Sequence, residues 1–533
     1  MAHQKRSLLV LPLIVFLSSV LGGIYGSAVQ AAASAPESTP VSEISLDRDV
    51  DSFAKAYALV QQNFANPVDP NKALYRGAIP GMLRTLDPHS NFFDPKDYQV
   101  FKEDQNGHYS GVGMQVGPRG SKTVIIAPFP GSPAYKAGLR PGDTIVSVND
   151  KSTEGLNTTE VADLLKGPRN TAVKISVRRE GAPDYITFNV IREDISRKTV
   201  QDAFWVKPGI AYIHILSFGD YTFRELEQNL RRLGENRIDG LVLDLRDNPG
   251  GLLDQAVDVC DHFLQKGQTI VSQRGRASAE KVYRASRGNQ GRDYPIVVLV
   301  NRYSASAAEI VSGALQDHDR AWILGETTFG KGLVQTLYPL SDHTGLALTT
   351  AHFYTPSGRL IQRDYSHSSF YDYYFDKDRN ARNPNDVKMT DGGRTVYGGG
   401  GITPDERYAV PKMDGLEAEL YRNGLFAFTR AYFAQHPATL PKGWLPDNDV
   451  IEQLHDFELK NGVKFSEAEF TADHDWIRRH LAKEMYIWAF NVDESDRVYA
   501  MTDPEVQKAL DAMPEATTLM EHARKAIVQR MRQ

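Results

Sequence analysis

The pattern of apolar and polar residues changes several times along the chain, and each change predicts a different kind of structure. From residue 50 to about residue 101, apolar side chains at helical spacing predict short amphipathic helices. The clearest set is Phe53, Tyr57, Val60 and Phe64. Turn motifs at 86–90 and 93–95 separate the helices. We therefore expect an N-terminal helical segment over residues 48–106.

Residues 107–193 have the period of β-strands instead. Val173, Ile175 and Val177 alternate with polar residues, which is typical of a half-buried strand. The other predicted elements are strands at 124–126 and 145–148 and a helix at 158–165. The segment is expected to form a small domain of strands with one or two helices.

From residue 209 to about residue 402, apolar strands alternate with helices. Predicted strands lie at 210–216, 241–245, 296–300 and 346–354, and predicted helices at 223–233, 252–264 and 307–315. The run at 296–300 is apolar at every position, as expected for a strand covered on both faces. This order predicts a largely parallel α/β core, which we assign to residues 194–410.

After residue 411 the apolar spacing becomes helical again, as at Ile477, Leu481 and Met485. We expect a C-terminal helical extension over residues 411–533. Three roles are open to it: covering the core, forming a homo-oligomer, or docking an adaptor or other partner.

The first residues have the layout of an export signal. Lys5 and Arg6 precede an uncharged run whose apolar centre spans 8–24, and Val29-Gln30-Ala31 resembles a signal-peptidase site. We assign residues 1–33 to a signal peptide and residues 34–47 to a polar linker. The apolar centre is nearly as long as the roughly 20 residues that cross a bilayer, so an uncleaved anchor in the inner membrane is the alternative. Either assignment places the rest of the chain outside the cytoplasm, in the periplasm or another extracytoplasmic space.

Composition narrows the function further. The 533-residue chain has 61 basic and 67 acidic residues, a net charge of −6, and no basic stripe, so a nucleic-acid partner is not expected. No cysteine–histidine cluster has metal-ligand spacing, and we predict neither a metal nor a cofactor. The single cysteine, Cys260, excludes an internal disulfide and lies in an apolar helical stretch typical of a buried thiol.

Ser306 is the candidate nucleophile. It lies between the apolar strand at 296–300 and the start of the next predicted helix, where backbone N–H groups favour a developing negative charge. Its neighbours Ala305 and Ala307 leave room for a substrate backbone. A serine in this place is more often a simple helix cap, and this alternative stays open for Ser306 alone.

Lys331 is the candidate base. It lies between Gly330 and Gly332 in an apolar setting, where loss of solvent would lower the pKa of its amine. Gln335 follows four residues later, on the same face of a helix or a strand, and its amide could orient the amine without adding charge. An exposed lysine in a glycine loop is the competing interpretation.

The loop Asp244-Leu245-Arg246-Asp247-Asn248-Pro249-Gly250-Gly251 ends one strand and opens a helix. A backbone N–H of Gly250 or Gly251, with that of Ala307, could form an oxyanion hole. An ordinary turn is the alternative, and Asp244 and Arg246 are expected to be structural. No histidine is obviously placed for a Ser-His-Asp triad; His262 and His318 are interpreted as surface residues of helices, and His352 as a strand residue.

These motifs together resemble the carboxyl-terminal processing peptidases, also called tail-specific proteases. The matching segments are Tyr-Ser-Ala-Ser-Ala-Ala-Glu-Ile at 303–310, Thr-Phe-Gly-Lys-Gly-Leu-Val-Gln at 328–335, and the segments 245–251, 354–359 and 400–404. The resemblance implies a ClpP/crotonase-like protease core with Ser306 as nucleophile, Lys331 as base and Gln335 as the residue orienting it. It does not explain the helical extension.

The small domain at 107–193 resembles a PDZ domain through Gly131-Ser132-Pro133-Ala134, the glycines at 138 and 142, and Val148-Asn149. PDZ domains bind a peptide C-terminus as an added strand, with its carboxylate held by backbone amides. Gly111, Val112, Gly113 and Met114 match that loop. The resemblance implies a domain inserted before the core that captures apolar protein tails and gates the protease.

The leading hypothesis is therefore an exported serine endopeptidase that cleaves proteins near their C-termini. A PDZ-bearing adaptor without turnover is a second hypothesis, which intact Ser306, Lys331 and Gln335 disfavour. A crotonase-type acyl-CoA enzyme is a third, since a shared core does not fix the function.

Overall fold

The computed structural model describes residues 43–105, 107–366, 370–375 and 386–532. The expected export segment at 1–33 and most of the linker at 34–47 lie outside these ranges. Helix α2 (Glu43–Asn63) already begins at Glu43, so the end of the predicted linker is helical. No proline follows Pro40 before Pro67, and nothing in between interrupts the helix. No helix among the described residues is long and apolar enough to cross a membrane.

The central sheet has six strands in the order β10-β11-β12-β15-β16-β21. The bounds are β10 Val200–Lys207, β11 Ile210–Ile215, β12 Gly240–Asp244, β15 Ile296–Val300, β16 Trp322–Gly325 and β21 Glu406–Arg407. All neighbours are parallel except β10 and β11, which form an antiparallel hairpin. The predicted parallel α/β core is confirmed.

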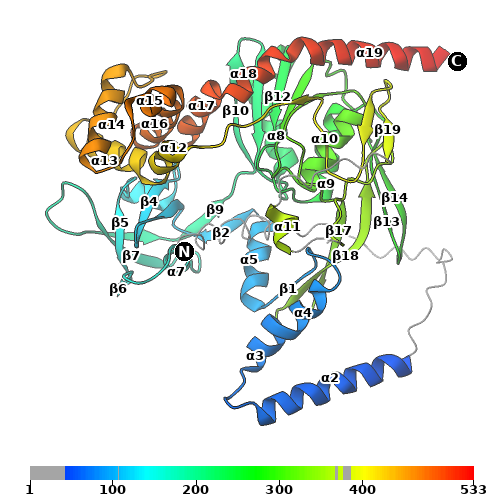
Figure 1. The fold of residues 1–533 in the computed structure, drawn as a ribbon, viewed down its shortest axis with the longest axis horizontal. Coiled ribbons are helices and arrows are strands. Elements are labelled where there is room, and N and C mark those ends of the chain that lie inside the picture. The colour runs from blue at the N-terminus through cyan, green and yellow to red at the C-terminus, as the bar shows by residue number, and fades with distance from the viewer. Residues whose placement is uncertain (1–42, 106, 367–369, 376–385, 533) are drawn as a thin grey trace.

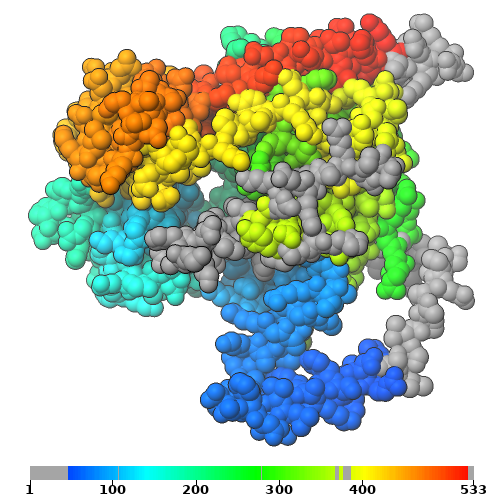
Figure 2. Space-filling model, viewed as in Figure 1, coloured from blue at the N-terminus to red at the C-terminus, as the bar shows by residue number. Residues whose placement is uncertain are grey.

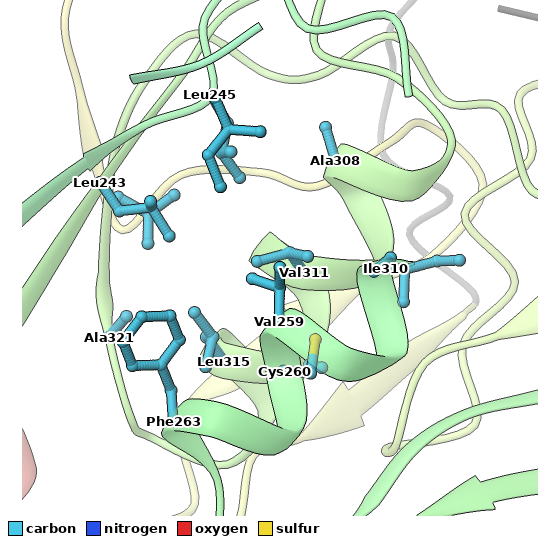
Figure 3. Close-up of a cluster of buried hydrophobic side chains, with 14 of the residues drawn as sticks. Leu243, Leu245, Val259, Cys260, Phe263, Ala308, Ile310, Val311, Leu315 and Ala321 are labelled. Atoms are coloured by element: carbon cyan, nitrogen blue, oxygen red, sulfur yellow. The ribbon is translucent and has the colours of Figure 1, made fainter. Parts of the chain in front are cut away.

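Both faces of this sheet are covered. Leu241, Leu243 and Leu245 belong to the cluster that packs on α8 (Thr222–Leu233), α9 (Leu253–Phe263) and α10 (Ala307–Asp317), and Figure 3 shows Leu243 and Leu245 facing these helices. Cys260 is buried in the same cluster, as expected. The alternate residue Val242 faces the opposite way, toward the last helices of the chain.

Those last helices are α17 (Val492–Thr502), α18 (Pro504–Asp511) and α19 (Met513–Arg532). Val506, Ala509 and Met513 pack against Val242 and Leu299 on the second face of the sheet. Part of the C-terminal extension is therefore a layer of the core, which is the first of the three roles considered for it. Figure 1 shows α18 and α19 running over the top of the green strands.

A second sheet has the order β1-β18-β13-β14, with β17 also paired to β18. Its strands are β1 Asn91–Phe93, β13 Thr269–Gly275, β14 Ser278–Arg284, β17 Leu333–Pro339 and β18 Gly345–Tyr354. Strand β1 comes from the segment predicted as purely helical, whose helices are α2, α3 (Pro70–Ala73), α4 (Ile79–Arg84) and α5 (Pro95–Gln105). A strand of three residues is too short to show a period, so this prediction was incomplete.

The small domain is a separate sheet of strands β3 to β8 with its own apolar core. Its elements are β3 Met114–Arg119, β4 Lys122–Pro128, α6 Pro133–Ala137, β5 Thr144–Val148, β6 Lys151–Ser152, α7 Thr158–Leu165, β7 Ala172–Arg178 and β8 Ile186–Ile191. A ribbon of β2 (His108–Gly111) and β9 (Glu193–Ser196) connects it to the rest of the chain. Figure 1 shows the cyan domain set apart from the green core.

Five helices after residue 411 form a bundle that lies against the small domain. They are α12 Gly415–Glu419, α13 Leu425–Gln435, α14 Asn448–Lys460, α15 Glu467–Ala472 and α16 His474–Ala489. The guanidinium of Arg119 lies 4.5 Å from the ring centre of Phe426, and a Cβ on Gly142 would come within 2.3 Å of the ring of Trp488. Figure 2 shows the orange bundle resting directly on the cyan domain.

Candidate active site

Ser306 occupies the N-cap position of α10, directly before Ala307. Its backbone has φ 55° and ψ −113°, which is costly for a residue with a side chain. An ordinary cap needs no such strain: Ser132 and Ser466 cap their helices with φ of −69° and −94°. The side chain is only 7% exposed. The strained conformation is typical of a functional serine and not of a simple cap.

Lys331 lies between β16 and β17 and is 2% exposed, so the interpretation as an exposed loop lysine is wrong. Burial lowers the pKa of its amine from 10.5 to about 7, although the carboxylates of Asp87 and Glu309 act in the opposite direction. The Nζ donates a hydrogen bond to Oε1 of Gln335 over 3.1 Å. The amine is therefore largely uncharged slightly above neutral pH, as a general base must be.

Glu309 connects the serine and lysine segments. Its Oε2 accepts the backbone N–H groups of Ser306 and of Lys331, each over 2.8 Å, and its Oε1 accepts that of Gly330 over 2.7 Å. The hydroxyl of Thr328 donates to the same carboxylate. Because one oxygen binds both backbones, the two segments are held side by side.

The sequence analysis missed Glu309, and one signal could have indicated it. It is a carboxylate among Ala307, Ala308, Ile310 and Val311, in the otherwise apolar first half of the helix. A buried charge at such a position requires several donors, so it indicates that another segment approaches there.

A second missed contribution comes from residues 87–90, which the sequence analysis interpreted only as a turn. The backbone carbonyl of His89 accepts a hydrogen bond from Nε2 of Gln335 over 2.6 Å. Asp87 in turn accepts the backbone N–H groups of His89 and Ser90, each over 2.7 Å. The turn thereby fixes the amide of Gln335 with its oxygen toward Lys331.

The glycine loop after β12 lies against the serine. A Cβ on Gly250, which has φ 102°, would stand 2.7 Å from Cβ of Ser306 and 2.9 Å from the nitrogen of Ala307. Any side chain at Gly250 would therefore displace the nucleophile.

The N–H of Gly250 is already engaged, since it donates to Oδ1 of Asn248 over 2.8 Å. Among the described residues, the N–H groups of Gly251 and Ala307 have no hydrogen-bond acceptor. Of the two glycines predicted as oxyanion donors, Gly251 is the one whose N–H is available.

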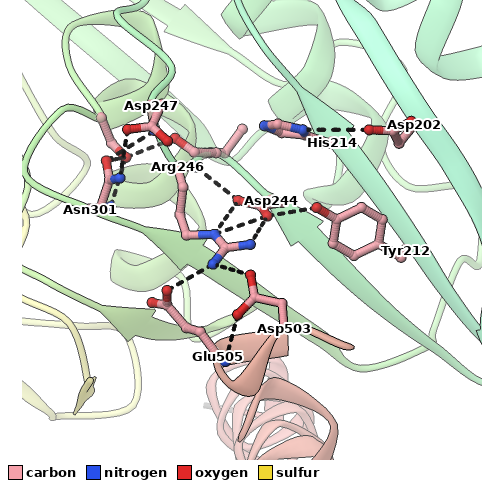
Figure 4. Close-up of polar contacts among 11 residues, drawn as sticks. Asp202, Tyr212, His214, Asp244, Arg246, Asp247, Asn301, Asp503 and Glu505 are labelled. Carbon is pink, nitrogen blue, oxygen red and sulfur yellow. Dashed lines mark hydrogen bonds and ion pairs between the residues drawn. The ribbon is translucent and has the colours of Figure 1, made fainter. Parts of the chain in front are cut away.

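Arg246 and Asp244 make structural contacts at the start of the same loop. Nη2 of Arg246 donates to Asp244 over 2.6 Å, and its Nη1 reaches Asp503 over 2.7 Å and Glu505 over 2.8 Å (Figure 4). Burial opposes ionisation of Asp244, but Arg246 and His214 together lower the pKa of this carboxyl to about 2. The contacts join the glycine loop to α18, at the far end of the chain.

Two of the histidines considered for a triad, His262 and His318, have partners outside the site, and His352 is a residue of β18 that pairs with Leu333. His262 is buried, so the prediction that it lies on a helix surface was wrong. Its Nε2 lies 2.8 Å from Oε1 of Glu235. The ring of His318 lies between Asp391 and the carbonyl of Thr269. Within the described ranges no group of three or more His, Cys, Asp or Glu side chains has an arrangement that could hold a metal ion.

The predicted peptide-binding loop lies in the small domain. Gly111 ends β2 and Met114 begins β3, an edge strand that pairs only with β4. The carbonyls of Val112 and Gly113 accept the N–H groups of Ala134 and Phe129, whereas their own N–H groups meet no acceptor in the described part of the chain. Two donors beside an unpaired strand edge are what an incoming peptide carboxylate and strand would require.

Family models match three parts of the chain. The model for peptidase family S41 matches residues 209–366, the PDZ domain model matches 124–179, and the model for the activating protease CtpB N-terminal domain matches 24–97.

Curated relatives match over the central part. The carboxy-terminal-processing protease of Bartonella bacilliformis is 38% identical over 58% of this chain and 72% of its own length. The carboxy-terminal processing protease CtpB of Bacillus subtilis is 34% identical over 60% of this chain and 66% of its own length. Among solved structures, a photosystem II D1 C-terminal processing protease is 31% identical over 60% of this chain and 89% of that chain, with a TM-score of 0.34.

Proposed function

This chain belongs to peptidase family S41 and is a serine peptidase of the carboxy-terminal processing type, and from that premise we propose that Ser306 and Lys331 form its catalytic dyad. Gln335 orients the lysine amine, and the N–H groups of Gly251 and Ala307 form the oxyanion hole. The buried, hydrogen-bonded amine of Lys331, with a pKa of about 7, is the observation that carries the proposal.

The reaction follows from these roles. Oγ of Ser306 attacks the carbonyl carbon of the scissile peptide bond while its proton passes to Nζ of Lys331. The two N–H groups stabilise the negative oxygen of the tetrahedral intermediate. As the C–N bond breaks, the leaving amine takes the proton from Lys331. Water then attacks the acyl-serine ester and gives its proton to Lys331. As the ester C–O bond breaks, Lys331 returns this proton to Oγ of Ser306, and the product with its new carboxyl group is released.

The PDZ domain supplies the substrate in this proposal. A protein with an exposed apolar tail adds that tail as a strand along β3, and the amides of the loop Gly111–Met114 hold its terminal carboxylate. The tail is captured on a domain separate from the core, so the bond that is cut lies near the C-terminus of the substrate. We place the reaction outside the cytoplasm because of the export signal read at residues 1–33.

The dyad is tested with residues 34–533 and a loosely folded protein that carries an apolar C-terminal tail. Ser306→Ala and Lys331→Ala should each lower the cleavage rate by at least about 100-fold, the usual size of a lost nucleophile or general base. Both variants should still bind the tail, whereas a bulky residue at Gly113 should abolish binding. Ser341→Ala and Lys266→Ala, at exposed positions, are matched controls.

Near-normal cleavage by the Lys331→Ala variant would remove the dyad. Tail binding without cleavage by the unaltered protein would favour the adaptor, and turnover of an acyl-CoA thioester would favour the crotonase-type enzyme.

A further inference from the structure

A short helix outside the residues matched by the S41 family model contacts residues next to the proposed dyad. Helix α11 (Phe370–Phe375) carries Tyr373, whose side chain is 3% exposed (Figure 1). The ring of Tyr373 packs with Phe329 and Ala305 in one apolar cluster, and Ala305 directly precedes Ser306. The tyrosine therefore lies close to the nucleophile without belonging to any motif singled out from the sequence.

A chain of hydrogen bonds leads from this tyrosine to the lysine. The hydroxyl of Tyr373 lies 2.8 Å from Nε2 of His89. The backbone carbonyl of His89 accepts from Gln335 over 2.6 Å, and Gln335 accepts from Lys331 over 3.1 Å. Each link is short, and each residue on the path is buried.

The hydroxyl of Tyr373 makes a second hydrogen bond, to the side chain of Gln362. Nε2 of Gln362 donates to the oxygen of Tyr373 over 3.1 Å, and Oε1 of Gln362 accepts the N–H of Gly332 over 2.9 Å. The same hydroxyl forms a hydrogen bond with Nε2 of His89, whose direction depends on the tautomer of the ring. Burial lowers the pKa of His89, with Lys331 and Arg363 adding to the effect, so its ring is neutral. Tyr373 thus anchors both flanks of Lys331, one through His89 and Gln335 and one through Gly332.

Resting on the dyad proposed above, we propose that Tyr373 is a positioning residue of the peptidase: through His89 and Gln335 it holds the amine of Lys331 in place and shielded from water, which makes α11 part of the catalytic apparatus. Without the hydroxyl, the turn at 87–90 loses a fixed contact and the amide of Gln335 loses its rigid support. Water then reaches the amine more easily, and the protonated form of Lys331 becomes less costly.

The charged groups that face Lys331 act in known directions. The carboxylates of Asp87 and Glu309 favour its protonated form and are opposed by burial. Arg363 acts on His89 and on the hydroxyl of Tyr373, and its guanidinium lies 3.7 Å from the ring centre of Phe329 and 4.6 Å from that of Tyr373. Substituting Tyr373 by phenylalanine leaves all of these charges in place, so a change in the titration of Lys331 would report the shielding and positioning.

The test compares Tyr373→Phe, which keeps the ring and its packing, with Tyr371→Phe on the exposed side of the same helix. Rates are expressed per reactive serine, titrated with a fluorophosphonate, so that any unfolded protein is not counted.

For Tyr373→Phe we expect kcat to fall about 10-fold with KM changed less than about 2-fold. The acidic limb of the pH profile, near 7 in the unaltered protein, should move upward by about half a pH unit or more. The fluorophosphonate reaction, which needs no protein substrate, should show the same shift, and Tyr371→Phe neither effect.

A double substitution separates positioning from substrate contact. In a Gln335→Ala background, Tyr373→Phe should cause little further loss, because both changes break the same path. Full additivity of the two losses, a rise in KM alone, or an unmoved pH profile would each overturn the inference. If Lys331→Ala is inactive while Tyr373→Phe behaves as the unaltered protein, this inference fails and the dyad stands. An active Lys331→Ala variant would remove the dyad itself.

Discussion

The fold buries Lys331 in a position that disfavours the charged form of its amine. Its amine is completely buried, and burial keeps its pKa near 7, far below the ordinary 10.5. Gln335 supplies one hydrogen bond, but removing the amine from water still costs free energy. In the dyad proposed above, Lys331 acts in catalysis at the expense of stability, a balance that is common at active sites.

The first prediction concerns Lys331→Met, which keeps the shape and removes the charge. A base whose pKa is depressed on folding binds fewer protons when folded, so the unaltered protein gains stability as pH rises from about 7 to 10.5. The variant lacks this dependence. At pH 8 we expect it to be inactive and more stable by about 1–3 kcal/mol, after the lost hydrogen bond is subtracted.

Thermal unfolding of the core at several pH values measures this effect. The difference between variant and unaltered protein should be largest below pH 7 and shrink toward pH 10. Lys266→Met, at an exposed site, should show no such trend. A destabilised Lys331→Met protein at pH 8 would mean that the amine is charged and paired in the fold.

At the scale of single residues, the sequence indicated the candidates that lie in short motifs. Ser306, Lys331 and Gln335 could be singled out as candidates because glycines, alanines and regular spacing surround them. Glu309 has one sequence signal, its charge at an apolar helix start, but only folding brings its partners Gly330 and Lys331 to it. Tyr373 has no such signal, because its partner His89 lies 284 residues away along the chain. Gly250 was assigned a free N–H that the side chain of Asn248 occupies.

Among the secondary-structure elements, the loop after β12 depends on a helix that follows it by half the chain. Arg246 lies between Asp244 on one side and Asp503 and Glu505 of α18 on the other (Figure 4). These groups are largely buried. Removing one partner from such a network leaves the others as uncompensated charges, which costs more than the pair contributes when intact.

The second prediction is that Arg246→Met destabilises the core by about 3–5 kcal/mol, the usual penalty for a broken buried ion pair. The loop carrying Gly250 and Gly251 should also lose its fixed position, so the rate of cleavage per folded molecule falls. The deficit in stability should be smaller at acidic pH, because protonated carboxyls need no cation. Urea unfolding at pH 5 and pH 8 measures it, with Arg276→Met at an exposed position as the control. An equal deficit at both pH values would contradict this account.

Helices α18 and α19 illustrate why the strands of the central sheet could be predicted, whereas the segment that covers their second face could not. A fully apolar run such as β15 indicates burial on both faces, and that expectation is confirmed. Nothing within the run says which segment provides the second face, and α18 and α19 resemble ordinary amphipathic helices in sequence. Strand β1 was missed because three residues show no period.

For the molecule as a whole, the PDZ domain is held from two sides. The ribbon of β2 and β9 connects it to the core, and the helical bundle packs on it through Trp488 at Gly142 and an ion pair between Arg430 and Glu180. In the proposed function, the position of a captured tail relative to Ser306 therefore depends on the bundle, which the resemblance to known families did not explain.

The third prediction uses two glycines of the PDZ domain with similar backbones. Gly142 has φ 83° and lies against Trp488, whereas Gly155 has φ 77° and faces open space. Gly142→Leu should therefore push the bundle away, while Gly155→Leu carries only the backbone strain. For Gly142→Leu we expect limited proteolysis to cut the ribbon of β2 and β9 faster than in the unaltered protein. Cleavage of proteins with an apolar tail should be several-fold slower, whereas hydrolysis of a small ester should be unchanged. Equal behaviour of the two variants would show that the bundle does not hold the domain.

The contact between Arg246 and α18 also limits when the core can fold during synthesis of the chain. A chain emerging from the ribosome contains Arg246 long before Asp503 and Glu505 have been made, and until then one side of the central sheet is bare. Domains generally fold as units, so this core closes only after the residues of α18 and α19 that cover the sheet have been made. A product that terminates before residue 503 would carry Ser306 and Lys331 in a core that lacks one of its layers. We expect protein quality control to degrade such a product before it can cleave other proteins.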